Sequence, residues 1–346
     1  MFFLKVVVCF ACFWAVFVHK CSAEWNLLGL EGKSVLSVEV HPTRDSIIYV
    51  GTNGVGLFVS RDNGKTWDHH LDSSSIYAII IDRKNPDKIL VGMEDGLSIS
   101  KNGGSRFKPL ADIMYNGKVY PYAGTGCMAI DETATQAIVV GINGGLFKTF
   151  DFGKTWEPAG LSDYEITSIS IDNFGRKAVI YAGTAGDGVF KSANYGMTWN
   201  SINNGINDPN VNALLCDRKL HNILYAGSLG GGAYISTDYG ANWQMITMDL
   251  RSLSGYTLEQ VVDPQTNRSV VYIGNYNGEV FKTEDGGNTF TKVGDKLEGK
   301  AVLCLGCSNV LPSSLYLGTN DGLYVMKQET QDNSLDETED SIQSEQ

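Results

Sequence analysis

The eight residues S-R-D-N-G-K-T-W at positions 60–67 decide the fold, because close variants of them occur six times in the chain. The other copies are S-K-N-G-G-S-R-F, T-F-D-F-G-K-T-W, S-A-N-Y-G-M-T-W, S-T-D-Y-G-A-N-W and T-E-D-G-G-N-T-F. Each copy ends in an aromatic residue, and consecutive ones are 40 to 49 positions apart: Trp67, Phe107, Trp156, Trp199, Trp243 and Phe290. A period of that size is typical of a solenoid or a propeller, in which one supersecondary unit is repeated.

A second landmark repeats with the same period. An apolar run closes on a glycine seven times, at Gly51, Gly92, Gly141, Gly183, Gly227, Gly274 and Gly318. Ten or eleven residues earlier stands an aspartate, or once each a histidine and a cysteine: His41, Asp82, Asp131, Asp172, Asp217, Asp263 and Cys307. The runs are short, rich in β-branched and aromatic residues, and bounded by turn residues, which indicates strands. The sequence therefore predicts an all-β fold, a seven-bladed β-propeller of four-stranded blades.

The repeated phrase has a structural interpretation at three of its positions. Its Asp or Asn can accept hydrogen bonds from backbone N–H groups of a turn. Its Gly can adopt a positive φ, and its Trp or Phe can fill the space between neighbouring sheets. We assign this role to Asp62, Gly64, Trp67, Asn102, Gly104, Phe107, Asp151, Gly153, Trp156, Asn194, Gly196, Trp199, Asp238, Gly240, Trp243, Asp285, Gly287 and Phe290.

The pattern S/T-x-D-x-G-x-T-W resembles the Asp-box, or BNR, repeat. Families with this repeat include sialidases, xyloglucanases, sortilin-type receptor domains and photosystem assembly factors. The resemblance extends over about residues 25–327 and implies a site on the upper face, around the central channel. The upper face carries the turns between the second and third strands and the connections between blades; the lower face carries the other turns and the repeated phrases. The motif implies no particular activity, because all of these families share it.

The ends of the repeat predict how the ring closes. Seven glycine-closed runs stand against six phrases, so the seventh blade lacks an outer strand. Residues 25–28, W-N-L-L, are similar to W-N-S-I at positions 199–202 and precede the first strand. We expect residues 25–28 to form the outer strand of the seventh blade, which leaves no blade unpaired.

Composition predicts the compartment and the domain boundaries. Lys5, an apolar run over 6–18 and the small residues up to Ala23 indicate a signal peptide over 1–23, cleaved after Ala23, and hence a secreted protein. The propeller then covers 24–328, and the acidic residues 329–346 predict a disordered tail. A net charge of −12 without a basic stripe argues against nucleic acid as a partner. We also expect no membrane span, a monomer, and glycosylation at Asn267 in N-R-S.

Four cysteines follow the predicted signal peptide: Cys127, Cys216, Cys304 and Cys307. An even number in a secreted protein is compatible with disulfides. However, Cys304 and Cys307 stand on one expected strand with side chains on opposite faces, and the other two belong to blades that are not neighbours. Buried free thiols are favoured over bridges, and the disulfide state stays open.

Catalysis receives little support from the residues. A sialidase would hold its substrate carboxylate with three arginines, but only Arg251 falls in an upper-face connection. A glycosidase would need two carboxylates, yet Asp95, Asp187 and Asp321 precede glycines in D-G pairs that tight hairpins require. The small residues of the first strands, with Glu259 as the single acid, predict a passive channel. We expect no catalytic residues, no cofactor and no metal.

Binding is expected at two long connections on the upper face, 108–125 and 244–256. Tyrosine and arginine are enriched at the centres of protein interfaces. The candidate binding residues are Tyr115, Tyr120, Tyr122, Arg251, Tyr256 and Glu259. We expect a non-catalytic scaffold for a protein or peptide partner. The alternatives are a glycan-binding module, a glycoside hydrolase or lyase, and loops that pack only on themselves.

Overall fold

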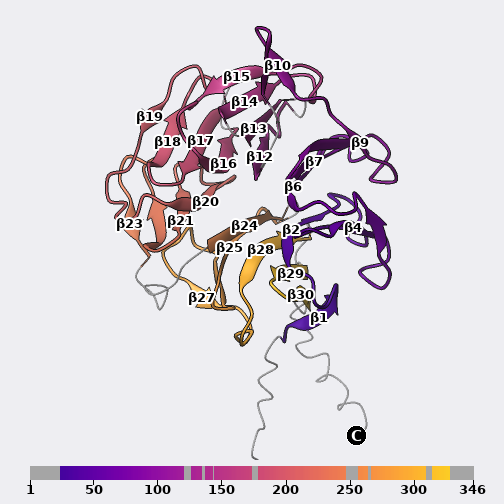
Figure 1. Cartoon of the computed structure of the whole chain (residues 1–346). Coiled ribbons are helices and arrows are strands. Elements are labelled where there is room, and N and C mark those ends of the chain that lie inside the picture. The colour runs from indigo at the N-terminus through magenta and orange to yellow at the C-terminus, as the bar shows by residue number, and fades with distance from the viewer. Residues whose placement is uncertain are drawn as a thin grey trace, which may run out of the picture.

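The structure is a computed structural model that describes residues 24–120, 126–134, 137–142, 144–173, 178–246, 256–263, 266–308 and 314–327. The predicted signal peptide (1–23) and acidic tail (329–346) lie outside these residues. The described part forms seven four-stranded antiparallel sheets arranged as a ring, with the first strand of each sheet nearest the centre (Figure 1). The predicted seven-bladed propeller is confirmed.

The strands follow the chain blade by blade. Blade 1 has β2 (Val35–Val40), β3 (Ile48–Thr52), β4 (Gly56–Ser60) and β5 (Asp68–His70); blade 2 has β6 (Ile76–Ile81), β7 (Ile89–Met93), β8 (Gly96–Ser100) and β9 (Lys108–Pro109). After the hairpin of β10 (Ile113–Tyr115) and β11 (Lys118–Tyr120), blade 3 has β12 (Cys127–Ile130), β13 (Ile138–Ile142), β14 (Gly145–Thr149) and β15 (Glu157–Gly160). Blade 4 has β16 (Ile166–Asp172), β17 (Val179–Thr184), β18 (Gly188–Ser192) and β19 (Asn200–Ser201).

The remaining blades repeat this order until the ring closes. Blade 5 has β20 (Val211–Cys216), β21 (Leu224–Ser228), β22 (Gly232–Ser236) and β23 (Gln244–Met245). Blade 6 has β24 (Tyr256–Val262), β25 (Ser269–Asn275), β26 (Val280–Thr283) and β27 (Thr291–Lys292). Blade 7 has β28 (Val302–Cys307), β29 (Ser314–Thr319), β30 (Gly322–Lys327) and, as its outer strand, β1 (Asn26–Gly29).

Ring closure joins the two ends of the described chain. Strand β1 pairs antiparallel with β30, with Asn26 opposite Val325 and Leu27 opposite Tyr324. Leu28 packs into the cluster between blades 7 and 1, where Trp67 also lies. The predicted closure by the N-terminal strand is confirmed, and it gives blade 7 four strands like the other blades.

Each of the seven repeated glycines lies on the second strand of its blade, opposite a residue of the neighbouring first strand in the same sheet. A Cβ atom on Gly141 would lie 2.5 Å from the Cys127 sulfur, which no packed structure tolerates. The thiol of Cys127 in turn donates to the carbonyl oxygen of Ile166 in the next blade, at 3.6 Å. Ser37 makes the equivalent contact to Ile76 at 3.2 Å. Gly51 and Gly141 therefore make room for the side chains of Ser37 and Cys127, which join neighbouring blades.

The repeated phrases form the turns between third and outer strands on the lower face. In the first copy, the Ser60 hydroxyl donates to Asp62 at 2.9 Å and accepts from the Gly64 N–H at 2.7 Å. Asp62 also accepts from the backbone and hydroxyl of Thr66 at 2.9 and 2.7 Å. The phrase glycine has a φ between 77° and 87° in all six copies, in the left-handed region that glycine adopts without strain. Local hydrogen bonding thus explains why the phrase recurs.

The core lies between the blades rather than within one layer. One cluster, for example, joins Tyr225 of blade 5 to Ile273, Phe281 and Phe290 of blade 6. Two phrase tryptophans also bond to the preceding blade: Trp199 Nε1 donates to the Ala159 carbonyl oxygen at 2.8 Å, and Trp243 Nε1 donates to that of Ile202 at 2.7 Å. Among the described residues, none forms a helix that is long and apolar enough to cross a membrane.

Candidate binding site in the central channel

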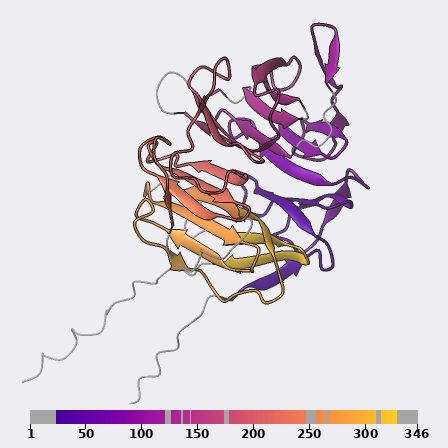
Figure 2. The ribbon, with the colours of Figure 1, turned by 60° about the vertical axis from the view of Figure 1, so that its left-hand side comes forward.

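Two predicted binding residues of the first long connection, Tyr115 and Tyr120, lie on the β10–β11 hairpin, which projects from the ring (Figure 2). Tyr115 is exposed near its tip, opposite Lys118 in the register of the hairpin. Tyr120 instead packs on Phe147 of blade 3, with ring centroids 4.8 Å apart, and the Lys118 ammonium lies 4.6 Å from its ring centroid. Tyr120 therefore anchors the hairpin to the ring, as expected for a loop that packs on the body of the protein.

The other predicted residues are divided between two places. Tyr122 and Arg251 lie outside the described residues, and Tyr256 begins β24 without a described side chain. Glu259 lies on β24 inside the channel, with a carboxylate oxygen 3.8 Å from Nη2 of Arg218. Of the candidates whose side chains are described, Glu259 lies in the channel, whereas Tyr115 and Tyr120 lie on the hairpin.

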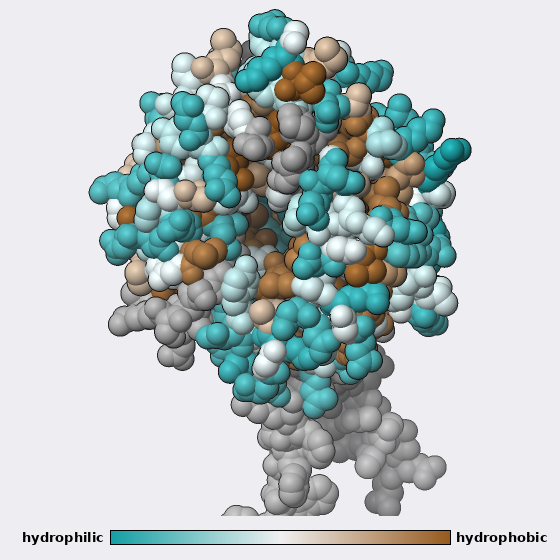
Figure 3. Space-filling view, viewed as in Figure 1, coloured by the Kyte–Doolittle hydropathy of each residue, from teal (hydrophilic) through white to brown (hydrophobic). Residues whose placement is uncertain are grey.

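A cavity of about 670 Å³ opens on the upper face instead, where the first strands of the blades begin. Six of the seven blades line it, including Tyr77 of blade 2, Met128 of blade 3, Glu165 of blade 4, Asn212 of blade 5 and Tyr276 of blade 6. Figure 3 shows one face of the ring, which is hollowed near its centre, with polar and apolar side chains around the hollow. Most of the lining residues lie on the first strands of the blades, whereas Glu165 and Tyr276 lie on connecting segments.

The mouth of the cavity is weakly charged. Among the lining residues that the structure describes, Glu165 carries the one charged side chain. Glu165 is exposed, and the N–H of Ala185 fixes its backbone carbonyl at 3.0 Å. Tyr276 is 41 % exposed at the same mouth. The arrangement offers aromatic faces and one carboxylate to a ligand.

Further down the channel, charged side chains from separate blades meet. Glu132 forms an ion pair with Nε of Arg83 at 3.3 Å and accepts a hydrogen bond from Nη1 of Arg218 at 3.2 Å. Arg218 also approaches Glu259, so one guanidinium group joins blades 3, 5 and 6. We call Glu39, Arg83, Glu132, Arg218 and Glu259 the lower-channel cluster. The prediction of a passive channel with Glu259 as its single acid is wrong.

Two carboxyl groups of this cluster are hard to ionise. Burial among the inner strands raises the pKa of Glu39 to about 7, and the nearby positive charge of Arg83 only partly opposes that effect. Burial also raises the pKa of Glu259, with Arg218 acting in the opposite direction. Glu39 lies two residues before His41, and the equivalent positions of other blades hold residues as different as Ile80, Ser170 and Leu215, so the repeat alone did not indicate an acid in the channel there.

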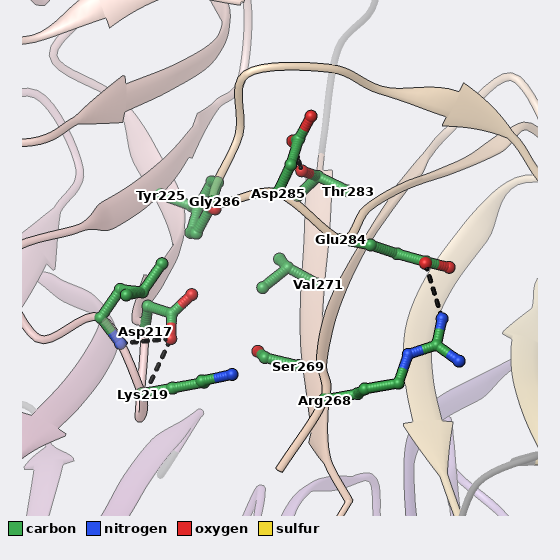
Figure 4. Close-up of a pocket in the computed structure, with 11 residues that line it drawn as sticks. Asp217, Lys219, Tyr225, Arg268, Ser269, Val271, Thr283, Glu284, Asp285 and Gly286 are labelled. Carbon is green, nitrogen blue, oxygen red and sulfur yellow. Dashed lines mark hydrogen bonds and ion pairs between the residues drawn. The ribbon is translucent and has the colours of Figure 1, made fainter. Parts of the chain in front are cut away.

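A smaller pocket of about 230 Å³ lies between blades 5 and 6 on the lower face (Figure 4). Its charged groups have partners within the protein: Arg268 donates to Glu284 at 2.9 Å, and the Lys219 ammonium donates to the Asn267 carbonyl at 2.5 Å. Asp217 accepts from the backbone N–H of Lys219 at 2.8 Å. These contacts make the pocket part of the packing between blades. Asn267 itself is exposed beside it.

The cysteines and the metal-ligating side chains show no reactive arrangement in the described part of the chain. All four cysteines are free, and Cys127, Cys216 and Cys304 are buried. Burial raises the pKa of the Cys127 and Cys304 thiols to about 12, which makes them poor nucleophiles. No three or more histidine, cysteine or carboxylate side chains among the described residues are grouped so as to hold a metal ion.

Comparison with known proteins agrees with this geometry. The family model of the BNR/Asp-box repeat matches residues 58–69, the first phrase and its flanks. The chain is a seven-bladed β-propeller that carries a BNR/Asp-box repeat. No curated protein matches it by sequence.

Several solved structures share the fold. A structure of YCF48 bound to D1 peptide is 15% identical, with a TM-score of 0.65, and the match covers 89% of this chain and 97% of that one. YCF48 from Cyanidioschyzon merolae is 13% identical over 88% of this chain and 98% of that one, with a TM-score of 0.64. The extracellular domain of the putative hybrid two component system BT4673 from B. thetaiotaomicron is 17% identical, with a TM-score of 0.65, over 89% of this chain and 40% of that one. At these identities the likeness shows the fold alone.

Proposed function

We propose that this Asp-box propeller is a non-catalytic scaffold that binds an extended segment of a protein or peptide partner in the upper cavity. The observation that carries the proposal is the cavity itself, about 670 Å³ in volume and lined by six blades. That volume lies within the range of about 300–1,000 Å³ that ligand sites usually have. Under this proposal the predicted signal peptide would deliver the scaffold to partners outside the cell.

The residues that line the cavity suit peptide binding better than glycoside hydrolysis. Apolar side chains such as Met128, Leu258 and Leu303 can receive apolar groups, while Asn212 and Thr257 add polar groups between them. A glycosidase needs two carboxyl groups about 5–9.5 Å apart, and Glu165 is the one acid among the described lining residues. The four-stranded blades hold these groups in place before binding, so little ordering entropy is lost when a partner binds.

The comparison with YCF48 supports the proposal without deciding it. The solved YCF48 structure is bound to D1 peptide, and it shares the ring over nearly its whole length. A propeller of this size can therefore present a peptide site. The present chain shares 15% of its residues with that protein, so the identity of any partner must come from the chemistry of its own cavity.

A glycan is the second candidate, because tyrosines stand at the mouth. Tyr77 and Tyr276 both line the cavity, and aromatic faces stack on sugar rings as well as on peptide groups. A glycan array probed with the full chain separates the two functions. Strong, selective binding to one sugar would favour this second candidate over the first.

The proposed peptide site is tested by filling the cavity. Leu303 lines it and is half-buried, so Leu303→Trp should occupy the space without disturbing the inter-blade clusters. We expect the full chain to enrich a set of sequences from a random heptapeptide display library, and the variant to lose about 90% of that capture if the anchoring side chain no longer fits. Met197→Trp is the matched control, since Met197 is 77 % exposed on the lower face.

Thermal melting of both variants checks that they are folded. Equal enrichment by Leu303→Trp and Met197→Trp would show that peptides bind elsewhere. A library that yields no enriched sequence with the unmodified chain would also contradict the proposal.

A further inference from the structure

We propose that the upper cavity selects a partner segment with a basic side chain, a lysine or an arginine, and holds that side chain against Glu165 among Tyr77 and Tyr276. This inference rests on the proposed function and adds to it the chemical class of the partner. It depends on three observations: the carboxylate at the mouth, the two tyrosines that line the same cavity, and the arginines below them, which are already paired with an acid.

Glu165 is available to a ligand. It stands between the turn at 161–164 and the start of β16, and its backbone is held there by Ala185. Its side chain is exposed, and no ion pair or side-chain hydrogen bond engages it within the described residues. Glu94 is also exposed, but of these two acids only Glu165 lines the cavity. A cation supplied by a partner would give Glu165 the counter-ion that the protein itself does not provide.

Two tyrosines line the same cavity as Glu165. Tyr77 belongs to blade 2, Glu165 to blade 4 and Tyr276 to blade 6, so the three residues are spread around the mouth on alternate blades. Ammonium and guanidinium groups are attracted to the faces of tyrosine rings within about 6 Å of the ring centre. The rim therefore combines the two groups, carboxylate and aromatic, that recognise a basic side chain.

Among the described residues, the groups below the mouth leave no arginine free for an acidic ligand. The lower-channel cluster contains the acids Glu39, Glu132 and Glu259 against the bases Arg83 and Arg218. Both arginines already contact Glu132, so neither is free to attract an acidic ligand from above. With a net charge of −12 on the whole chain, the long-range field also attracts basic segments and repels acidic ones.

The test is a peptide array probed with the labelled full chain. Octapeptides of varied sequence are printed in matched sets that differ only in the central residue, which is lysine, norleucine or glutamate. We expect the lysine members to bind at least about tenfold more tightly than their norleucine partners, as one charged hydrogen bond allows. We expect Glu165→Gln to remove that preference. Glu94→Gln is the matched control, because Glu94 is exposed on the upper face and does not line the cavity.

The outcomes separate this inference from the function on which it rests. In one outcome, norleucine or glutamate peptides bind as well as lysine peptides and lose their binding in Leu303→Trp. That outcome would support the peptide site and overturn the preference for a basic residue. A lysine preference that survives in Glu165→Gln would overturn the role of Glu165. Absence of binding by every set would remove both proposals. Raising the salt from 150 to 500 mM should weaken the lysine members selectively, since screening acts on the charge pair.

Discussion

The six phrase turns and the central channel differ in the hydrogen-bond partners that they give to acidic side chains. In the turns, each phrase Asp or Asn accepts a hydroxyl and at least one backbone N–H of its own segment. In the channel, the carboxyl groups of Glu165 and Glu39 have no such local partners within the described residues, and Glu39 is buried at a cost to its ionised form. The turns are repeated and the channel acids are not.

That difference separates the residues that stabilise the ring from the residues that are available to bind a ligand. The turn hydrogen bonds lower the pKa of Asp62 to about 2, as expected for a carboxylate stabilised by several donors. A group so fully engaged has no capacity left for a ligand. The charged channel residues are not required by the repeat, and one of them, Glu165, lines the upper cavity that a partner could reach. Three changes test this division, beginning with the repeated architecture.

The largest effect is expected from removing the strand that closes the ring. A chain that starts at Val35 lacks β1 and with it Leu28 and Trp25, which pack into the clusters on either side of blade 7. Truncating one large buried side chain costs about 2–5 kcal/mol, so the loss should reach about 5 kcal/mol or more. Thermal and urea unfolding followed by circular dichroism would measure it. An unchanged midpoint would show that the ring does not need β1.

Two point variants refine that result. Leu28→Ala should cost about 2–3 kcal/mol, because Leu28 lies in the cluster beside Gly64 and Trp67. Leu27→Ala should cost less than about 0.5 kcal/mol, since Leu27 on the same strand is 44 % exposed. Equal losses would indicate that β1 acts through strand pairing alone.

A smaller effect is expected at the glycine column. Gly141→Ala places a methyl group 2.5 Å from the Cys127 sulfur and 3.1 Å from Cβ of Ile166, so we expect a loss of about 2 kcal/mol. Adding Cys127→Ala removes the closer contact and should recover part of that loss, although Ile166 remains. A double-mutant cycle on urea midpoints measures the coupling. Additive losses would show that the glycine is needed for another reason.

The sequence predicted the ring well because the information is local. Each phrase determines its own turn, and the likeness of Trp25 to the phrase ends indicated how blade 7 is completed. The channel was predicted poorly because its contacts are not local. Arg218 reaches Glu132 across the channel, past blade 4, and no pattern in either segment records that pairing. Tyr120 resembled a free interface residue, but its position depends on Phe147 in another strand.

The smallest effect is expected from the channel acid Glu39, and it concerns pH. Its pKa is about 7 in the folded protein against an ordinary value of 4.5, so between these values the folded state binds more protons than the unfolded state. The contribution of this group to stability is therefore present at pH 5 and is lost as the pH rises towards 7 and beyond. Glu39→Gln should remove this dependence. Allowing for partial exposure, we expect the Tm difference between variant and native protein to change by about 2–4 °C from pH 5 to pH 8.

The comparison of variant with native protein at each pH isolates Glu39 from the other titrating groups. Glu259 shifts in the same direction, whereas the lowered pKa values of His41 and His70 favour the folded state as the pH rises towards 6.5. Those contributions remain in both proteins and cancel. The phrase aspartates titrate below the tested range, because their pKa values are lowered. A Tm difference that stays constant from pH 5 to pH 8 would mean that Glu39 is solvated and ionised like an ordinary surface acid, and that the channel resembles the turns in satisfying its charges.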